Sequence, residues 1–143
     1  MNPTISTIGV AAFRDDKVLL VRSGDSSGHI TGTYGLPSGR VDEGEKEIDA
    51  AAREFEEETG LVVNINDLSE FKNNTFTADI PRKDGTIKRM FWRVYRARNY
   101  SGKLKATDET VPEWVLIEQL DSYNLLPNVK NTIMNCLKDL NNG

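Results

Sequence analysis

The chain has 143 residues, of which 38% are hydrophobic and 28% are charged. This length and composition predict a single globular domain over residues 1–143. They exclude disordered and fibrous proteins, and no apolar run approaches the roughly 20 residues of a membrane span. Cys136 is the one cysteine and cannot form an internal disulfide. Residues 1–7 lack a signal-peptide pattern, so we expect a reduced, cytoplasmic protein.

The formal net charge of −4 is unevenly distributed. Nine acidic and two basic residues lie between Asp42 and Glu58, which gives this segment a charge of −7 and leaves +3 for the rest. Such a segment is either a solvated surface or a cation site, and most charge runs are solvated surfaces. The spacing of the acids has to decide between the two.

The predicted elements mix strands and helices. In chain order, we expect strands over 6–13 and 18–21, a loop over 23–35, a turn over 36–39, a helix over 45–59, strands over 61–65, 72–78, 87–97 and 113–117, and a helix over 129–140. The first two strands are predicted to form a hairpin, and Gly60 is expected to end the first helix. This order favours an α/β fold with a mixed sheet and helices on its faces.

The first helix has two distinct faces. Its apolar residues form a narrow stripe at helical spacing, made of Ile48, Ala51, Ala52 and Phe55. Glu54, Glu57 and Glu58 are spaced as i, i+3 and i+4, so their carboxylates converge beside this stripe and repel one another. A divalent cation such as Mg²⁺ would relieve this repulsion. Arg53 can pair with Glu57 or fold back toward Glu45, either as a surface ion pair or as a clamp on the carboxylates.

The same residues match a known signature. Gly39, Glu45 and the run Arg53-Glu54-Phe55-Glu56-Glu57-Glu58-Thr59-Gly60-Leu61 stand at the spacing G-x5-E-x7-R-E-U-x-E-E-x-G-U, where U is a bulky apolar residue. All seven fixed residues are present, so the chain resembles the Nudix family. Directly before the signature, Leu36-Pro37-Ser38-Gly39 stands where many members have Leu-Pro-Gly-Gly, so Ser38 is a mild departure. The later Trp114-Val115 and Glu118-Gln119-Leu120 resemble the family's tryptophan strand and short helix.

The resemblance implies an α/β/α sandwich with a mixed β-sheet between helices. It also implies hydrolysis of a nucleoside diphosphate linked to another group, with Mg²⁺ or Mn²⁺ as cofactor. By matching positions, Glu54, Glu57 and Glu58 would bind the metal, and we include Gly39 in that set. Glu54 is our choice of general base, whereas Glu45 and Arg53 would orient the other groups.

Other candidates lie outside the signature. Some members of the family add a metal-binding acid before the tryptophan strand, and we prefer Glu109 to Asp108 for this role, although either can be part of a solvated loop. Arg22 ends a strand where some members bind phosphate. Asn128 resembles a purine-reading asparagine, although an N-cap of the last helix is the simpler role. His29 is expected on a loop surface, and Cys136 in the core.

Residues 82–98 contain seven bases and one acid, interleaved with Phe91, Trp92 and Tyr95. Arginines here could meet phosphates and an aromatic ring could stack on a base, although strand alternation places at least one of these aromatics in the core. A pI near 5.1 argues against binding of extended nucleic acid.

Together these features predict a metal-dependent pyrophosphohydrolase that acts on a small nucleotide. Its expected substrate is a nucleoside triphosphate, including oxidised ones. An ADP-ribose or nucleotide-sugar diphosphatase is one alternative, and a non-catalytic nucleotide-sensing domain is another, which the intact acidic triad argues against. We expect no membrane partner, and the sequence leaves the oligomeric state open, with a homodimer as one option.

Overall fold

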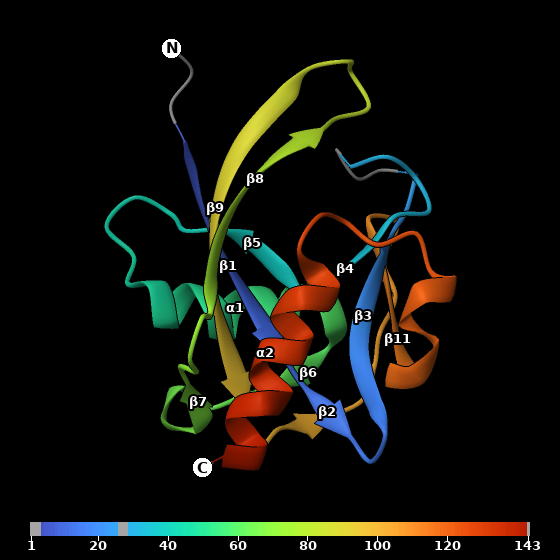
Figure 1. Cartoon of the computed structure of the whole chain (residues 1–143). Helices are drawn as coiled ribbons and strands as arrows, with labels where there is room; N and C mark the ends of the chain where they lie inside the picture. Colours follow the sequence, from blue (N-terminus) through green and yellow to red (C-terminus); the bar gives the residue numbers. More distant parts are fainter. Residues whose placement is uncertain (1–3, 26–28, 143) are drawn as a thin grey trace.

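The computed structural model describes residues 4–25 and 29–142 (Figure 1). Its strands form two principal sheets. The first is mixed and contains β1 (Ile5–Ala11), β5 (Ser38–Arg40), β7 (Leu68–Ser69), β8 (Thr75–Pro81) and β9 (Ile87–Ala97). The second contains β2 (Phe13–Arg14), β3 (Lys17–Ser23), β4 (Tyr34–Gly35) and β11 (Thr110–Leu116). A short third pairing joins β6 (Leu61–Val62) to β10 (Ser101–Gly102).

Two helices cover opposite faces of these sheets. Alternate residues of the central strands point to different cores: Ile8 and Val10 of β1 pack with α1 (Glu47–Thr59), whereas Ala11 packs in the core that contains α2 (Val129–Asn142). Because both faces are covered, β1 and β3 are almost continuously buried. The predicted α/β/α sandwich is therefore confirmed, with α1 and α2 on the two sides of the strands (Figure 1).

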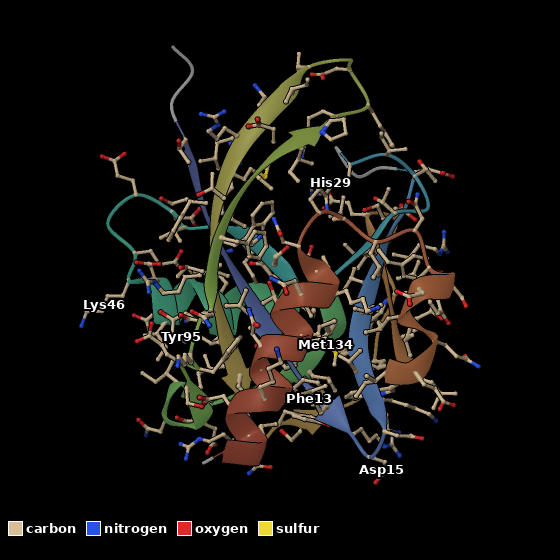
Figure 2. All side chains as sticks on the ribbon, viewed as in Figure 1. Phe13, Asp15, His29, Lys46, Tyr95 and Met134 are labelled. Atoms are coloured by element: carbon tan, nitrogen blue, oxygen red, sulfur yellow. The ribbon has the colours of Figure 1, made fainter. Side chains whose placement is uncertain are left out.

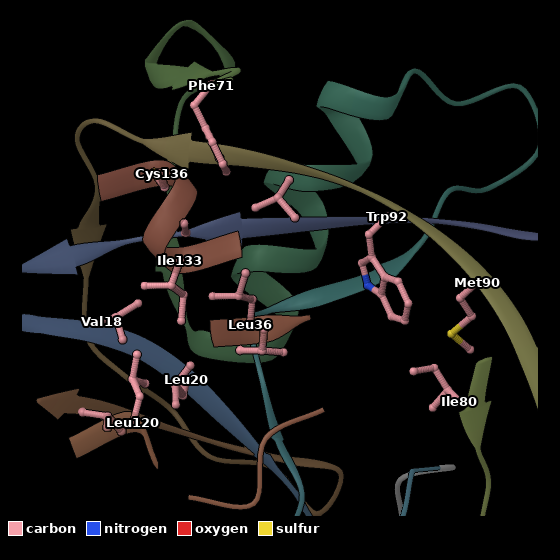
Figure 3. Packing of buried hydrophobic residues seen from close by; sticks show 14 residues of the cluster. Val18, Leu20, Leu36, Phe71, Ile80, Met90, Trp92, Leu120, Ile133 and Cys136 are labelled. Atoms are coloured by element: carbon pink, nitrogen blue, oxygen red, sulfur yellow. The ribbon is translucent and has the colours of Figure 1, made fainter. Parts of the chain in front are cut away.

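The core around α2 reaches out along the β8–β9 hairpin. Ile133 and Cys136 of α2 are fully buried, as expected for Cys136. Their cluster continues through Trp92 and Met90 of β9 to Ile80 of β8 (Figure 3). Short 3-10 helices at Ile65–Asp67 and Ile117–Ser122 complete the structure. No helix in the part of the chain that the structure describes is long and apolar enough to cross a membrane.

The predicted hairpin of residues 6–13 and 18–21 is wrong for most of its length. β1 pairs with β5 and with β9, in parallel with the latter, and only the short strand β2 pairs with β3. Both edges of β1 are already paired, by β5 and by β9, so no edge is left for β3. The chain leaves the first sheet at Ala12 and continues as β2, which pairs with β3 in the second sheet. The second predicted hairpin, β8–β9, is antiparallel and confirmed.

Several predicted boundaries also shift. The helix starts at Glu47 and not at Glu45, because Glu45 is used in the preceding loop, where its carboxylate accepts the Asp42 N–H at 3.0 Å. The predicted loop and turn contain the short strands β4 and β5, and β8 begins at Thr75. The end of the helix at Gly60 is confirmed: this residue has φ +84° and its N–H donates to Glu56 O.

The buried face of α1 is rotated from the predicted stripe. Ala50, Ala51, Phe55 and Thr59 are buried, whereas Ile48 and Ala52 are half-buried. The cause is the Ser38–Arg40 segment of β5, which packs against the flank of α1 that carries Glu54 and Glu58. These two carboxylates therefore lie inside the buried arc of the helix and not beside it.

Candidate active site

Glu58 is the most enclosed of the three helix carboxylates. Its Oε1 accepts the Ser38 N–H at 2.6 Å, which ties the end of α1 to β5. Burial raises the pKa of Glu58 to about 8, with smaller contributions from the negative charges of Glu54, Glu109 and Glu57. The charges of Glu54, Glu57 and Glu109 thus all act on Glu58. The choice of Glu109 over Asp108 as a metal-binding residue stays a prediction.

Gly39 makes room for a second carboxylate. A Cβ added to Gly39 would overlap the carboxyl group of Glu54, so this position of β5 has no space for a side chain. Burial also raises the pKa of Glu54, even though Arg53 donates to its Oε1 at 2.8 Å. The glycine is required here for close approach and not for an unusual backbone angle.

Arg53 connects the helix to the loop before it. Its Nε and one terminal nitrogen each lie 2.9 Å from a different oxygen of Glu45, a bidentate pair. It also lies 3.3 Å from Glu57 Oε2 and donates to Arg40 O at 3.1 Å. The bonds from Arg53 and the Asp42 N–H lower the pKa of Glu45 to about 2. Arg53 thus contacts Glu45 and Glu57 at the same time, the two partners expected from the sequence. Such contacts suit a residue that orients carboxylates.

The donor set fits a divalent metal in chemistry. Its candidate ligands are oxygen atoms of Glu54, Glu57, Glu58 and Glu109, with a backbone oxygen from Gly39. Within residues 4–25 and 29–142, no three acidic, histidine or cysteine side chains stand ready to hold an ion together. Glu57 is turned toward Arg53 and its side chain is 57% exposed, so it is free to rotate toward its neighbours.

Two adjoining hollows open beside Glu58. The acidic pocket is lined by Glu58, Ser23, His29 and Thr110, together with Val21. The aromatic pocket is lined by Phe76, Trp92, Val94, Pro127 and Val129, together with Gly9. Gly35, Leu36, Ser38 and Leu126 line both. An apolar slot and a carboxylate site therefore share one wall.

The aromatic pocket contains a stacked pair of rings. Phe76 and Trp92 lie 4.8 Å apart between centroids with an interplanar angle of 20°. Trp92 is 6% exposed and belongs to the core, as strand alternation predicts for one aromatic of this segment. Phe76 comes from β8 and is half-buried, and it could not be identified from the sequence because nothing near it there marks a site.

His29 was expected on a loop surface, and this is wrong. The side chain is partly buried and lines the acidic pocket beneath the β8–β9 hairpin (Figure 2). Burial, with a smaller contribution from the positive charge of Arg82, lowers the pKa of His29 to about 4. The backbone bridge that joins the two residues spans 53 positions, so no local pattern could reveal it.

Arg22 and Asn128 are not brought to these pockets. Arg22 alternates along β3 with Val21 and Ser23, which line the acidic pocket, so its side chain leaves the other face of the strand. Asn128 lines a separate outer hollow with Lys130 and Met134. It directly precedes α2, which is the place of an N-cap. The N–H and the hydroxyl of Thr132 donate to its backbone oxygen, and not to its side chain.

The arginines of β9 also have other partners. Arg89 pairs with Asp79 at 2.9 Å, and Arg93 pairs with Glu47 and Glu70 at 3.1 Å each. Both share a strand face with Phe91, opposite the face of Trp92. For Arg89 and Arg93, the expectation that arginines of this segment hold phosphates therefore has no support in this arrangement.

Comparison with known proteins agrees with the signature. The family model described as NUDIX domain matches residues 3–136. The chain belongs to the Nudix family. Over 71 residues it is 38% identical to Nudix hydrolase 6 of Arabidopsis thaliana, a match that covers 47% of this chain and only 25% of that protein.

Solved Nudix structures share the fold. A MutT protein from Methanosarcina mazei superposes with a TM-score of 0.77 at 21% identity. The match covers 99% of this chain and 97% of the M. mazei chain. A MutT NUDIX hydrolase from Burkholderia pseudomallei gives 0.74 at 23% identity, covering 94% and 98%. An Ap4A hydrolase from C. elegans gives 0.67 at 18%, covering 98% and 100%. At these identities, the likeness describes the fold.

Proposed function

We propose that this Nudix chain, as a single domain over residues 1–143, is a metal-dependent pyrophosphohydrolase that acts on a nucleoside triphosphate, including oxidised ones. One observation carries the proposal: Glu58, which feels the charges of Glu54, Glu57 and Glu109, lines a pocket that shares a wall with the pocket of the stacked aromatic rings. The carboxylates suit the phosphate end of a nucleotide through a cation, and the rings suit a base.

Each residue has a role in this proposal. Glu54, Glu57, Glu58, Glu109 and the Gly39 backbone oxygen would hold Mg²⁺ or Mn²⁺. Such an ion neutralises charge on phosphate oxygens and acidifies a bound water. Glu45 and Arg53 position the carboxylates through their bidentate pair. Ser38, whose N–H donates to Glu58, fixes that side chain at the wall shared by the pockets.

The chemical step is hydrolysis of a P–O–P bond. A water oxygen attacks phosphorus, the bridging P–O bond breaks, and the bridging oxygen leaves with the second phosphate product. Glu54 takes a proton from the water as general base, a role favoured by its partial burial, which raises its pKa toward the working pH. Arg53, bonded to Glu54 Oε1, keeps that carboxylate in place.

The roles of Arg22 and Asn128 as substrate contacts remain a proposal. Neither residue lines the two pockets, so each would contact only a part of the nucleotide that extends beyond them. We propose a cytoplasmic location, with which the use of one buried cysteine, Cys136, is consistent. The substrate and the metal are small diffusible partners, and a homodimer is one option for the assembly.

The experiment is a product panel with Mg²⁺. The protein is incubated with nucleoside triphosphates, oxidised triphosphates, ADP-ribose, nucleotide sugars and dinucleoside polyphosphates, with EDTA as the control. We expect a triphosphate to yield a nucleoside monophosphate and pyrophosphate. Two monophosphates from ADP-ribose or a sugar nucleotide would favour the diphosphatase instead. Binding without any product would overturn the enzyme proposal in favour of a sensing domain.

A further inference from the structure

The tip of the β8–β9 hairpin is fastened to the loop that follows β3. Lys83 donates from Nζ to the backbone oxygens of Asp25 at 2.6 Å and Gly24 at 3.2 Å. Next to it, Arg82 forms an antiparallel bridge with His29, whose ring nitrogen lies 3.4 Å from the Arg82 guanidinium. These contacts join segments more than 50 residues apart, at the outer end of a hairpin that projects from its sheet (Figure 1).

The tip has its own internal bonds. Asp84 accepts the Thr86 N–H at 2.9 Å and the Thr86 hydroxyl at 2.6 Å, and Arg82 N–H donates to Thr86 O. Gly85 supplies the left-handed backbone angle of the turn, with φ +85°. Lys83 is therefore presented from a turn that holds its own shape.

Gly24 lies between this turn and the loop before β11 that contains Asp108 and Glu109. Its carbonyl accepts from Lys83, and its N–H donates to Glu109 O at 2.7 Å. A Cβ at Gly24 would overlap the carbonyl oxygen of Asp108, so the two backbones are in direct contact. One residue, Gly24, thus connects Lys83 to Glu109, whose negative charge influences Glu58.

The hairpin connects the two pockets as well. Nearer its base, Phe76 and Trp92 line the aromatic pocket, and at its tip Arg82 contacts His29 of the acidic pocket. Ile80 and Met90, buried in the core, hold the arms of the hairpin between these points (Figure 3). Apolar packing therefore anchors the arms of the hairpin in the core, whereas the described contacts of its tip with the loop after β3 are polar.

We propose that Lys83 is a positioning residue that fastens the hairpin tip over the pockets and so holds the Glu109 loop in place for metal and nucleotide. This inference rests on the proposed function. Two hydrogen bonds from one exposed ammonium are strong enough to bias the tip and weak enough to open reversibly. The clasp sets how well metal and nucleotide bind, whereas Glu54, Glu57 and Glu58 stand on α1 and do not depend on it.

The test replaces Lys83 in the full chain. Lys83→Met removes the ammonium, Lys83→Arg keeps a positive donor, and Lys138→Met is the matched control, since Lys138 is an exposed lysine on α2. Amide exchange measured by NMR provides a readout that needs no activity. We expect the Gly24 amide of Lys83→Met to exchange about tenfold faster, with α2 amides unchanged and Lys83→Arg close to wild type.

Kinetics and metal binding test the positioning role. For Lys83→Met we expect KM and the half-saturating Mg²⁺ concentration each to rise about tenfold, with kcat at saturation within about twofold of wild type. Unchanged exchange at Gly24 would overturn the clasp. Faster exchange with unchanged KM and Mg²⁺ dependence would overturn its role. If the product panel shows no activity, Mn²⁺ affinity by calorimetry replaces kinetics: a tenfold loss supports the clasp, and no loss overturns it.

Discussion

The carboxylate site and the aromatic pocket are built in opposite ways. Apart from Glu109, the carboxylate site is made of residues between Gly39 and Glu58, held by one helix, one short strand and one arginine. The aromatic pocket takes Gly9 from β1, Phe76 and Trp92 from the β8–β9 hairpin, and Val129 from α2, three parts of the chain that are far apart in sequence. The first depends on one short stretch of sequence, so the same residues can recur in other members of a family. The second is assembled only by folding of the whole chain. A chain can therefore share its metal chemistry with relatives while its substrate pocket is its own.

Gly39→Ala breaks the carboxylate site and has the largest expected effect. The new Cβ would overlap the Glu54 carboxyl group, so either this side chain or β5 must move. We expect kcat/KM to fall more than about 100-fold, because Glu54 is a proposed metal ligand and not merely a residue that holds a ligand in place. Because the overlap is with the end of a flexible side chain, we expect the free energy of unfolding to fall by no more than about 1 kcal/mol. Steady-state kinetics and urea unfolding measure these changes.

A double-mutant cycle is the control for Gly39→Ala. If the clash with Glu54 causes the loss of stability, Gly39→Ala should cost almost nothing in a Glu54→Ala background. An equal cost in both backgrounds would show that the strain lies elsewhere in β5.

Phe76→Leu sharpens the comparison from the other side. It removes one ring of the stacked pair but leaves the acids untouched. In the proposal, a nucleotide base contacts the Phe76 ring, and a contact between two aromatic rings contributes about 1 kcal/mol. We therefore expect KM for the nucleotide to rise roughly fivefold, with kcat nearly unchanged. A fall in kcat at constant KM would mean that the aromatic pocket is not where the base binds.

His29 reports on the boundary between the two regions and should give the smallest effect. It is the single histidine of the chain, so its imidazole resonance can be followed alone by NMR. We expect a pKa of about 4, against an ordinary value of 6.5. Between these values the unfolded chain binds a proton that the folded chain does not. The free energy of unfolding should therefore decrease as the pH falls through this window.

Arg82→Met should raise the pKa of His29 only part of the way, because burial is the larger cause. A wild-type midpoint near 6.5 would contradict the buried position of this ring.

The same contrast explains what the sequence could predict. The periodicity of residues 45–59 predicted the helix and the convergence of its acids, because both depend on neighbours within four positions. It did not predict that β5 covers one flank of α1 and draws Glu54 and Glu58 into the buried arc. That depends on the pairing of β5 with β1, which is a tertiary contact.

Charge misled where partners are distant. The bases of residues 82–98 suggested that arginines there could meet phosphates, yet Arg89 and Arg93 pair with acids from other elements. Lys83 instead binds backbone oxygens some 58 residues away, which no charge pattern encodes. The hairpin of β8 and β9 itself was predicted from its Asp84-Gly85 turn, because that signal is local.

The measurement that tests the central proposal most directly is Mn²⁺ binding by calorimetry, with turnover, on two neighbouring variants of α1. Glu57→Gln removes a proposed ligand, whereas Glu56→Gln removes an exposed acid from the same helix turn and has the same charge effect. We expect Glu57→Gln to fold normally, to bind Mn²⁺ more than about 100-fold less tightly and to lose turnover, with Glu56→Gln within about twofold of wild type. Wild-type affinity and rates in Glu57→Gln would contradict the proposed metal site.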